Sequence, residues 1–251
     1  MRIIDTHVHL RDDESFRHTI DLERAAGVVR MVVSCLEPCD GIYKPTPEQF
    51  HEDNARVHQW MKREAGFVEG WAYVNPEYQK QSLDEIDLAV NEYGMTGVKL
   101  ECGCVCTDTR YGPVMEKAES LGIPVLQHAW FKITGCIPGE STPVDVVALA
   151  RGFPGVTIIM AHIGGDWQRG IKAVRDLPNV LVDTSGSIVD CGMIEEAVAE
   201  LGAKRILFGT DLPDIDFWTN LGKIDGAEIT AEQRSLILHG NASRLLRGGA
   251  E

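Results

Sequence analysis

Residues 3–10 of the chain read IIDTHVHL, and the two histidines in this stretch decide how the fold is interpreted. In an extended strand successive side chains point to opposite faces, so Asp5, His7 and His9 share one face and the residues between them share the other. Three polar side chains on one face of a strand need a partner. That partner has to come from distant parts of the chain or from a bound group.

Similar apolar runs, rich in Val and Ile, recur along the chain and predict eight strands, at residues 3–8, 28–34, 67–74, 96–101, 123–129, 156–162, 180–185 and 205–211. The segments between them are typical of helices, most clearly at residues 47–65, 81–93, 113–121, 143–151, 166–177 and 194–201. Strands that alternate with helices form right-handed βαβ units and a parallel sheet. Eight such units in 251 residues favour a closed α/β barrel, a (β/α)₈ TIM barrel, as a single domain over residues 1–251.

Two connections stand out in this pattern. The longest one, residues 37–46, follows the second strand and is expected to be a lid or rim loop. Residues 214–229, which contain glycines and follow the last strand, are expected to form a loop over the mouth of the barrel.

The composition limits the class of protein. Hydrophobic residues make up 44% and charged residues 25% of the chain, as in ordinary globular proteins, and the net charge is −14. The acidic balance argues against a nucleic-acid partner, and no apolar run is long enough to span a membrane. Because the N-terminus lacks the apolar segment of a secretory signal, we expect a cytoplasmic protein whose seven cysteines are thiols rather than disulfides.

Barrel enzymes place their chemistry at the carboxyl ends of the strands, which we call the mouth of the barrel. The polar side chains predicted at these strand ends are His7, His9, Lys99, Glu101, His128, His162 and Asp211. Imidazole and carboxylate groups are the ligands that borderline divalent metals such as Zn²⁺ prefer. We therefore expect the partner of His7 and His9 to be a metal ion.

Five sequence elements are distinctive together: HVH at residues 7–9, HAW at 128–130, MAHIGGDW at 160–167, FGTDLP at 208–213 and GNASRLL at 240–246. In this order they resemble the amidohydrolase superfamily, specifically the amidohydrolase-related branch that includes nonoxidative decarboxylases. The resemblance covers nearly the whole chain.

The resemblance implies a role for each matching position. His7, His9 and His128 match metal ligands of the first and fifth strands, and Asp211 matches the eighth-strand aspartate that binds metal and often serves as general base. His162 matches the sixth-strand histidine, which is a ligand in two-metal relatives and usually an acid or base beside the metal in one-metal relatives. Asp211 and His162 are therefore the expected catalytic residues.

The fourth strand leaves an alternative open. Two-metal relatives bridge their ions there by a carboxylated lysine or a glutamate, and the segment GVKLEC contains both Lys99 and Glu101. We favour Glu101 as a metal ligand because it lies nearer the end of the strand. The expected cofactor is one or two divalent ions, Zn²⁺ first and Mn²⁺ as the alternative.

Two kinds of chemistry fit such a site. Because a bound metal lowers the pKa of water toward neutrality, we expect a metal-dependent hydrolase of a small amide, ester or lactone, with Asp211 as general base. The alternative is a metal-dependent nonoxidative decarboxylase, a lyase acting on a small organic acid. A non-catalytic barrel with a structural metal is disfavoured, since it needs no base beside an open metal position.

The expected partner is a small-molecule substrate. Three cationic residues, Arg110, Lys132 and Arg169, are predicted to lie near the mouth and to hold a carboxylate group of that substrate. The sequence leaves open whether the chain forms a homo-oligomer.

Overall fold

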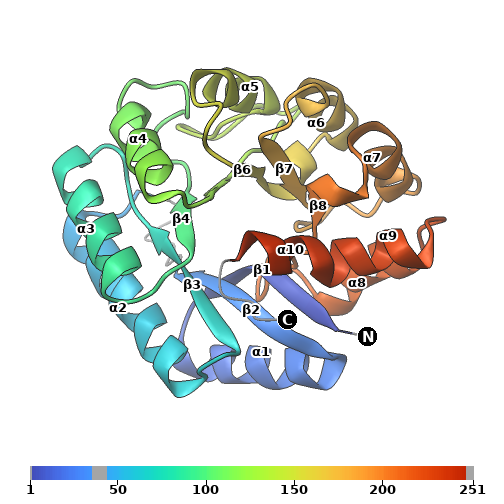
Figure 1. Cartoon of the computed structure of the whole chain (residues 1–251), viewed down its shortest axis with the longest axis horizontal. Coiled ribbons are helices and arrows are strands. Elements are labelled where there is room, and N and C mark those ends of the chain that lie inside the picture. The colour runs from blue at the N-terminus through green and yellow to red at the C-terminus, as the bar shows by residue number, and fades with distance from the viewer. Residues whose placement is uncertain (1, 36–43, 247–251) are drawn as a thin grey trace.

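The computed structural model describes residues 2–35 and 44–246. Its centre is a single sheet of eight parallel strands, each paired with the next strand along the chain (Figure 1). The strands are β1 (Ile3–Leu10), β2 (Val28–Cys35), β3 (Val68–Tyr73), β4 (Gly97–Leu100), β5 (Val125–Gln127), β6 (Ile158–Met160), β7 (Val180–Asp183) and β8 (Ile206–Leu207).

Hydrogen bonds between β1 and the segment at and after β8 close the sheet into a barrel. The backbone N–H of Thr6 donates to the carbonyl of Phe208 (3.0 Å), and that of His9 donates to the carbonyl of Leu212 (2.7 Å). In the other direction, the N–H of Asp211 donates to the carbonyl of His7 (2.8 Å). The predicted (β/α)₈ TIM barrel is thus confirmed, and its closure brings residues from the two ends of the chain together.

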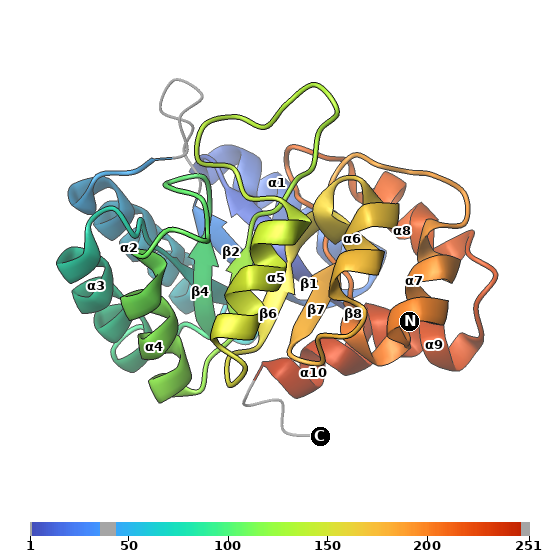
Figure 2. The ribbon, with the colours of Figure 1, turned by 90° about the horizontal axis from the view of Figure 1, so that it is seen from above.

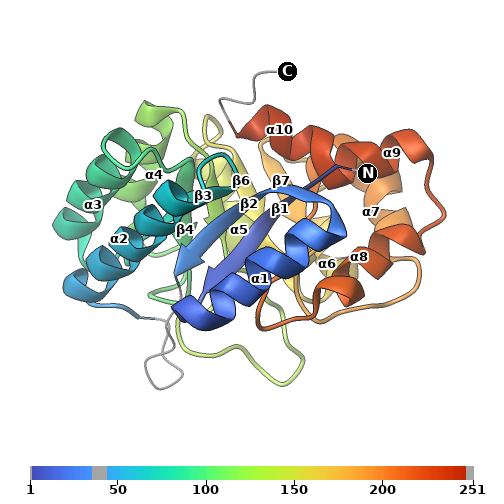
Figure 3. The ribbon, with the colours of Figure 1, turned by 90° about the horizontal axis from the view of Figure 1, so that it is seen from below.

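Helices surround the barrel, and Figure 3 shows α1 lying along β1 and β2. The α-helices are α1 (Asp13–Ala26), α2 (Pro47–Arg63), α3 (Gln79–Asn91), α4 (Tyr111–Leu121), α5 (Pro143–Gly152), α6 (Trp167–Val174), α7 (Met193–Leu201), α8 (Phe217–Asp225), α9 (Ala231–Ser235) and α10 (Asn241–Leu245). The six predicted helices are confirmed as α2 to α7 with ends shifted by up to three residues, whereas α1 was not predicted.

The predicted loop at residues 214–229 is wrong, because most of it is the helix α8. Asp216 caps this helix by accepting a hydrogen bond from the N–H of Thr219 (2.8 Å). Phe217, Leu221 and Ile224 recur at helical spacing and are buried. The predicted lid at residues 37–46 lies largely outside the described residues.

The barrel has a closed end and an open end. A small apolar cluster fills its interior and includes Ile4, Val32 and Trp71, and Ala242 and Leu246 at the C-terminal end pack against the same cluster. Figure 2 shows α10 at the lower edge of the barrel and the loops that follow the strands at the upper edge. Any cavity for a ligand is therefore expected at the upper edge, the mouth.

Two further sequence predictions concern the chain as a whole. The six described cysteines, Cys35, Cys102, Cys104, Cys106, Cys136 and Cys191, are free thiols, as expected, and Cys39 lies outside the described residues. Among the helices that the structure describes, none combines the length and the apolar character that crossing a membrane requires.

The substitution Gly97→Ala is expected to destabilise the barrel by about 1–3 kcal/mol. A Cβ atom on Gly97 would lie 2.5 Å from the carbonyl oxygen of Pro124 and 2.5 Å from the ring of Trp71, and the backbone oxygen cannot move aside cheaply. Urea unfolding checks this expectation. Gly112→Ala in α4 is the matched control, because nothing lies within 4 Å of its Cβ position, and equal stability of both variants would contradict the prediction.

Two buried carboxyl groups, Asp5 on β1 and Glu23 on α1, make stability depend on pH. Burial raises the pKa of Asp5 to about 6, although the N–H groups of His7 and Thr210 donate to it. Burial and the nearby Asp5 also raise the pKa of Glu23 well above its usual range. Since both groups bind protons more tightly in the folded chain, their contribution to stability is full at low pH and is lost as pH rises.

The variant Glu23→Gln is therefore expected to be more stable than the wild type at pH 8 and to lose this advantage at pH 4. The gain at high pH comes from removing the buried negative charge that Glu23 carries beside Asp5 above its raised pKa. Urea unfolding of both proteins at the two pH values measures it. An identical stability difference at pH 4 and pH 8 would refute the assignment of the titration to this pair.

Candidate metal centre

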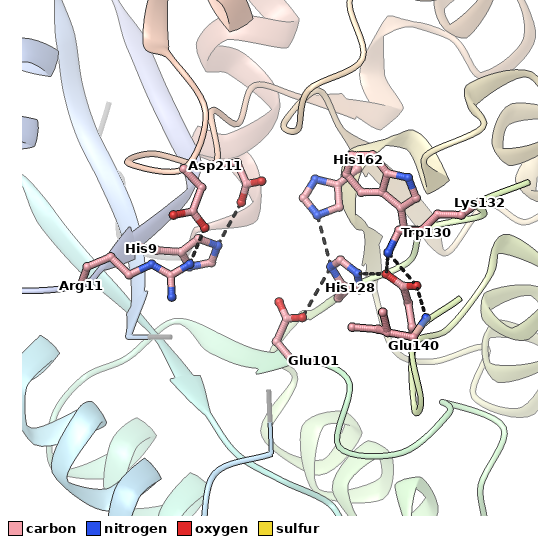
Figure 4. Close-up of a pocket in the computed structure, with 11 residues that line it drawn as sticks. His9, Arg11, Glu101, His128, Trp130, Lys132, Glu140, His162 and Asp211 are labelled. Carbon is pink, nitrogen blue, oxygen red and sulfur yellow. Dashed lines mark hydrogen bonds and ion pairs between the residues drawn. The ribbon is translucent and has the colours of Figure 1, made fainter. Parts of the chain in front are cut away.

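A cavity of about 440 Å³ opens at the mouth of the barrel, a size typical of sites for small molecules (Figure 4). The residues that line it are His9, Arg11, Glu101, His128, Trp130, Lys132, Ile137, Glu140, His162, Asp211 and Asp214. They come from β1 and from the segments that follow β4, β5, β6 and β8. The structure thus brings most of the predicted site residues together, as closure of the barrel requires.

His7 has a fixed orientation at the wall of this site. Its Nδ1 lies 2.8 Å from Oδ2 of Asp183, which is fully buried at the end of β7. Burial disfavours the charged carboxylate, but the contact with His7 outweighs it and holds the pKa of Asp183 well below its usual range. Because an ionised carboxylate only accepts hydrogen bonds, Nδ1 of His7 carries the proton, and Nε2 presents its lone pair to the site.

His9 and Asp211 complete one side of the site. Nε2 of His9 lies 3.0 Å from Oδ1 of Asp211, and Nε2 of His7 lies 3.5 Å from the same oxygen. One ligand atom from each of these three residues lies within 4.8 Å of the other two. Asp211 adopts φ 71°, a left-handed conformation that is rare for a residue other than glycine. Such strain is typical of functional sites, where the surrounding structure enforces it.

The carboxylate of Glu140 sets the tautomer of His128. Nε2 of His128 lies 3.1 Å from Oε1 of Glu140, which also accepts hydrogen bonds from Lys132 and from the N–H of Ile137. Burial raises the pKa of Glu140, but these hydrogen bonds together lower it to about 2, so the group is ionised. Nε2 of His128 must therefore donate, and Nδ1 is left with a lone pair that faces the cavity.

His162 presents a second nitrogen lone pair, which lies close to Nδ1 of His128. Ser185 donates its hydroxyl proton to Asp183 and so accepts from Nδ1 of His162 at 2.8 Å. Nε2 of His162 then has no proton, and it lies 3.3 Å from Nδ1 of His128. Burial lowers the pKa of His162 to about 3, which keeps the ring neutral. Like Asp211, His162 has a left-handed backbone, with φ 59°.

These hydrogen-bond directions are the test of whether a metal fits. Two nitrogen lone pairs that face each other at 3.3 Å repel unless a cation lies beside them. Nε2 of His7 presents a third lone pair, which accepts a hydrogen bond from the ammonium group of Lys99 at 3.0 Å, and Asp211 is an ionised carboxylate close by. Nitrogen and carboxylate donors of this kind suit a divalent transition metal. The donor set of the mouth therefore fits such an ion. His7, His128 and Asp211 present donor atoms, and His9 can join them once its Nε2 gives up the hydrogen bond to Asp211.

Both fourth-strand candidates lie at this site. The ammonium group of Lys99 is fully buried and lies 2.8 Å from Oε1 of Glu101 and 3.0 Å from Nε2 of His7. Oε2 of Glu101 lies 3.5 Å from Nδ1 of His128. Burial raises the pKa of Glu101, but His128 and Lys99 lower it to about 2. The positive group of Lys99 thus contacts His7, and the negative group of Glu101 lies near His128.

The structure separates the three predicted substrate-binding cations. Lys132 lines the cavity, but Glu140 accepts from its ammonium group at 2.7 Å and 2.9 Å. Arg110 pairs with Asp108 at 2.8 Å and with Glu77 at 3.1 Å, and it does not line the cavity.

Arg169 likewise lies outside the cavity lining. It stacks over the ring of Phe131 at 4.4 Å and pairs with Asp166 at 3.2 Å. We therefore correct the placement of Arg110 and Arg169, because nearby carboxylates hold both side chains away from the cavity.

Three further residues that shape the site were not predicted from the sequence. Asp183 lies inside a predicted strand, and its position at the strand end was the available signal. Arg11 continues the alternation of Asp5, His7 and His9 and so points to the same face of β1. Glu140 comes from an irregular loop, where no periodic pattern marks it.

The fold and this donor set define a (β/α)₈ barrel protein with a candidate divalent-metal site at its mouth. A family model described as amidohydrolase matches residues 4–248, so the chain belongs to the amidohydrolase family. The predicted resemblance is confirmed. No protein of curated function matches the chain significantly.

Solved structures share the barrel at low sequence identity. A 2,6-dihydroxybenzoate decarboxylase from Rhizobium is 18% identical, with a TM-score of 0.78 over 98% of this chain and 99% of that chain. A dihydroxybenzoic acid decarboxylase from a Polaromonas species, with bound manganese and the inhibitor 2-nitroresorcinol, is 17% identical, with a TM-score of 0.79 over 99% and 98%.

A third structure is a 5-carboxyvanillate decarboxylase from Novosphingobium aromaticivorans, in complex with manganese and 4-hydroxy-3-methoxy-5-nitrobenzoic acid. It is 15% identical, with a TM-score of 0.76 over 98% of this chain and 96% of that chain. At these identities the likeness shows the fold alone.

Proposed function

We propose that the protein is a metal-dependent nonoxidative decarboxylase, a lyase that removes CO₂ from a small organic acid. The observation that carries this proposal is the cluster of ligand atoms from His7, His9 and Asp211 beside the lone pair of His128. Structures with the same barrel are decarboxylases, and two of them contain manganese. This support reverses the order expected from the sequence, which placed hydrolysis first.

The same comparison favours Mn²⁺ over Zn²⁺ as the native ion. His7, His9, His128 and Asp211 would hold it, and Glu101 is an additional ligand if a second ion binds. When bound, the metal would hold substrate oxygen atoms and draw electron density away from the bond that breaks.

Residues of the chain would carry out the proton transfer that decarboxylation requires. The carbon that loses CO₂ must gain a proton in its place. Asp211 is ionised, because His162 and His9 lower its pKa more than burial raises it. It would take the proton of a substrate hydroxyl or a water molecule and deliver it to that carbon. His162 is neutral, and its Nε2 lone pair would accept a hydrogen bond from the substrate and orient it.

Part of the wall of the cavity is aromatic. The ring of Trp130 lines the cavity, and its centre lies 4.9 Å from that of the His162 ring. An aromatic wall of this kind offers a surface on which a planar acid can stack. The proposed partner is accordingly a small planar organic acid.

Hydrolysis of an amide, ester or lactone is the second candidate. It is favoured by the contact of Asp211 with the cavity, since the side chain is 15% exposed and water can reach it. Asp211 would then take a proton from the attacking water rather than from the substrate.

One experiment separates the two candidates. The Mn²⁺-loaded protein is incubated with hydroxybenzoates and other small acids, and in parallel with lactones, esters and amides. Membrane-inlet mass spectrometry follows CO₂, and chromatography follows the products. The proposal expects CO₂ in equal amounts to the acid consumed. Turnover of a lactone, ester or amide without any release of CO₂ from the acids would overturn it in favour of hydrolysis.

A further inference from the structure

We propose that Arg11 binds a second carboxylate group of the substrate, one that stays on the molecule when CO₂ leaves. The inference rests on the proposed function and extends it to a class of substrate, the small planar dicarboxylic acids. It assigns Arg11 as a specificity-determining residue.

Arg11 has an unused hydrogen-bond donor at the edge of the metal centre. It follows His9 by two residues and lines the same cavity as His9 and Asp211 (Figure 4). Its Nη2 donates to Asp214, whereas its Nη1 is buried and has no hydrogen-bond partner among residues 2–35 and 44–246. A buried donor without a partner is costly, and a ligand that accepts from it recovers this cost.

The guanidinium group of Arg11 is restrained by its hydrogen bond to Asp214 and by partial burial. The Arg11 side chain is 16% exposed, and its backbone carbonyl accepts a hydrogen bond from Nη2 of Arg56 at 3.2 Å. A guanidinium group stays charged at all physiological pH values. Its planar fork of N–H donors matches the two oxygens of a carboxylate group. A negatively charged oxygen that binds beside Arg11 could therefore accept from this unpaired Nη1.

Among the cavity-lining residues of the described part of the chain, Lys132 is the other lysine or arginine. Its charge is already balanced by the buried carboxylate of Glu140, which accepts from it with both oxygens. Arg11 is paired more weakly, since its partner Asp214 is 45% exposed and occupies only Nη2. An incoming anion thus gains more from Arg11 than from Lys132.

The movement of negative charge during decarboxylation indicates which of the two carboxylate groups Arg11 would bind. During decarboxylation, negative charge leaves the departing carboxylate and moves to the carbon atom it was attached to. A cation bound to the departing group would stabilise the starting state more than the transition state and would slow the reaction. A carboxylate that keeps its charge throughout can be held by Arg11 without this penalty.

The test compares two probes that differ by one carboxylate. The first is 4-hydroxy-3-methoxy-5-nitrobenzoic acid, which is bound in one of the solved structures, and the second is 2-methoxy-6-nitrophenol, the same ring without the carboxylate. Calorimetric titration of the Mn²⁺-loaded protein gives the Kd of each. The wild type is expected to bind the acid roughly tenfold or more tightly than the phenol, as expected for one charged hydrogen bond.

Three variants make the comparison specific. Arg11→Met is expected to reduce the preference for the acid to about twofold or less while leaving the Kd of the phenol nearly unchanged. Arg30→Met is the matched control, because Arg30 is 20% exposed and pairs with Glu69 but lies outside the cavity lining, and it should keep the preference. Asp214→Asn removes the negative charge that is paired with Nη2 of Arg11, so this variant should keep or increase the preference for the acid.

The proposal is overturned if the wild type shows no preference for the acid, if Arg11→Met retains it, or if neither probe binds at millimolar concentration. Because binding needs no turnover, failure of the proposed function gives a different result. An Arg11-dependent preference together with the absence of CO₂ release from any acid would leave the assignment of Arg11 standing and remove decarboxylation.

Discussion

The variant Asp211→Asn is expected to lower kcat for decarboxylation by about 10²–10⁴-fold, the usual contribution of a general acid or base. The amide retains an oxygen that can accept the hydrogen bond from His9, but it cannot take up or return a proton at neutral pH. Steady-state kinetics with Mn²⁺-loaded protein, with the metal content measured in the same sample, checks the prediction.

Asp216→Asn is the control for this experiment. Asp216 lies five residues further on and caps α8, a task that asparagine performs equally well. Its activity should equal that of the wild type. Full activity of Asp211→Asn at full metal content would show that the proton is carried by another group.

The variant Asp183→Asn is expected to weaken Mn²⁺ binding by about 10–100-fold without unfolding the protein. The side-chain oxygen of asparagine can still accept from the N–H groups of His162 and Ser185, which Asp183 serves in the wild type. Its NH₂ group, however, would face Nδ1 of His7 and favour the tautomer in which Nε2 carries the proton. His7 would then present a proton, not a lone pair, to the metal.

Titration with Mn²⁺, followed by the electron paramagnetic resonance signal of the free ion, measures this affinity, and circular dichroism confirms the fold. Asp176→Asn serves as the control, since that side chain is 90% exposed on the surface. An unchanged affinity in Asp183→Asn would mean that His7 does not bind the metal through Nε2.

The barrel was predictable because its signal is repeated and local. Each strand is a short run of Val and Ile, and each of the six predicted helices carries its own apolar periodicity. The prediction of a loop at residues 214–229 was wrong because it relied on the glycines of this segment. The helical spacing of Phe217, Leu221 and Ile224 was overlooked. The N-cap Asp216 was the signal that could have corrected the prediction.

The candidate ligands were predictable from position alone, because a barrel brings the ends of all its strands to one mouth. The groups that orient those ligands were not. Asp183 and Glu140 act on histidines 176 and 12 residues away in sequence, and only the folded chain shows these pairs. The same limit explains Arg110 and Arg169, whose cationic groups are held by Asp108 and Asp166 rather than by a ligand.

Arg11, in contrast, could have been predicted from the sequence, because it follows His7 and His9 at the same two-residue spacing. It directly follows β1 and continues the alternation that identified His7 and His9, and its side chain lines the same cavity as His9. Its importance depends on Nη1 having no partner among the described residues, and that fact comes from the structure.

Anomalous X-ray diffraction from crystals soaked with Mn²⁺ tests whether the mouth of this barrel is a metal centre. One strong manganese peak is expected within coordination distance of His7, His9, His128 and Asp211. A map without such a peak, from protein that still releases CO₂ from an acid after treatment with a chelator, would contradict the assignment of a metal centre.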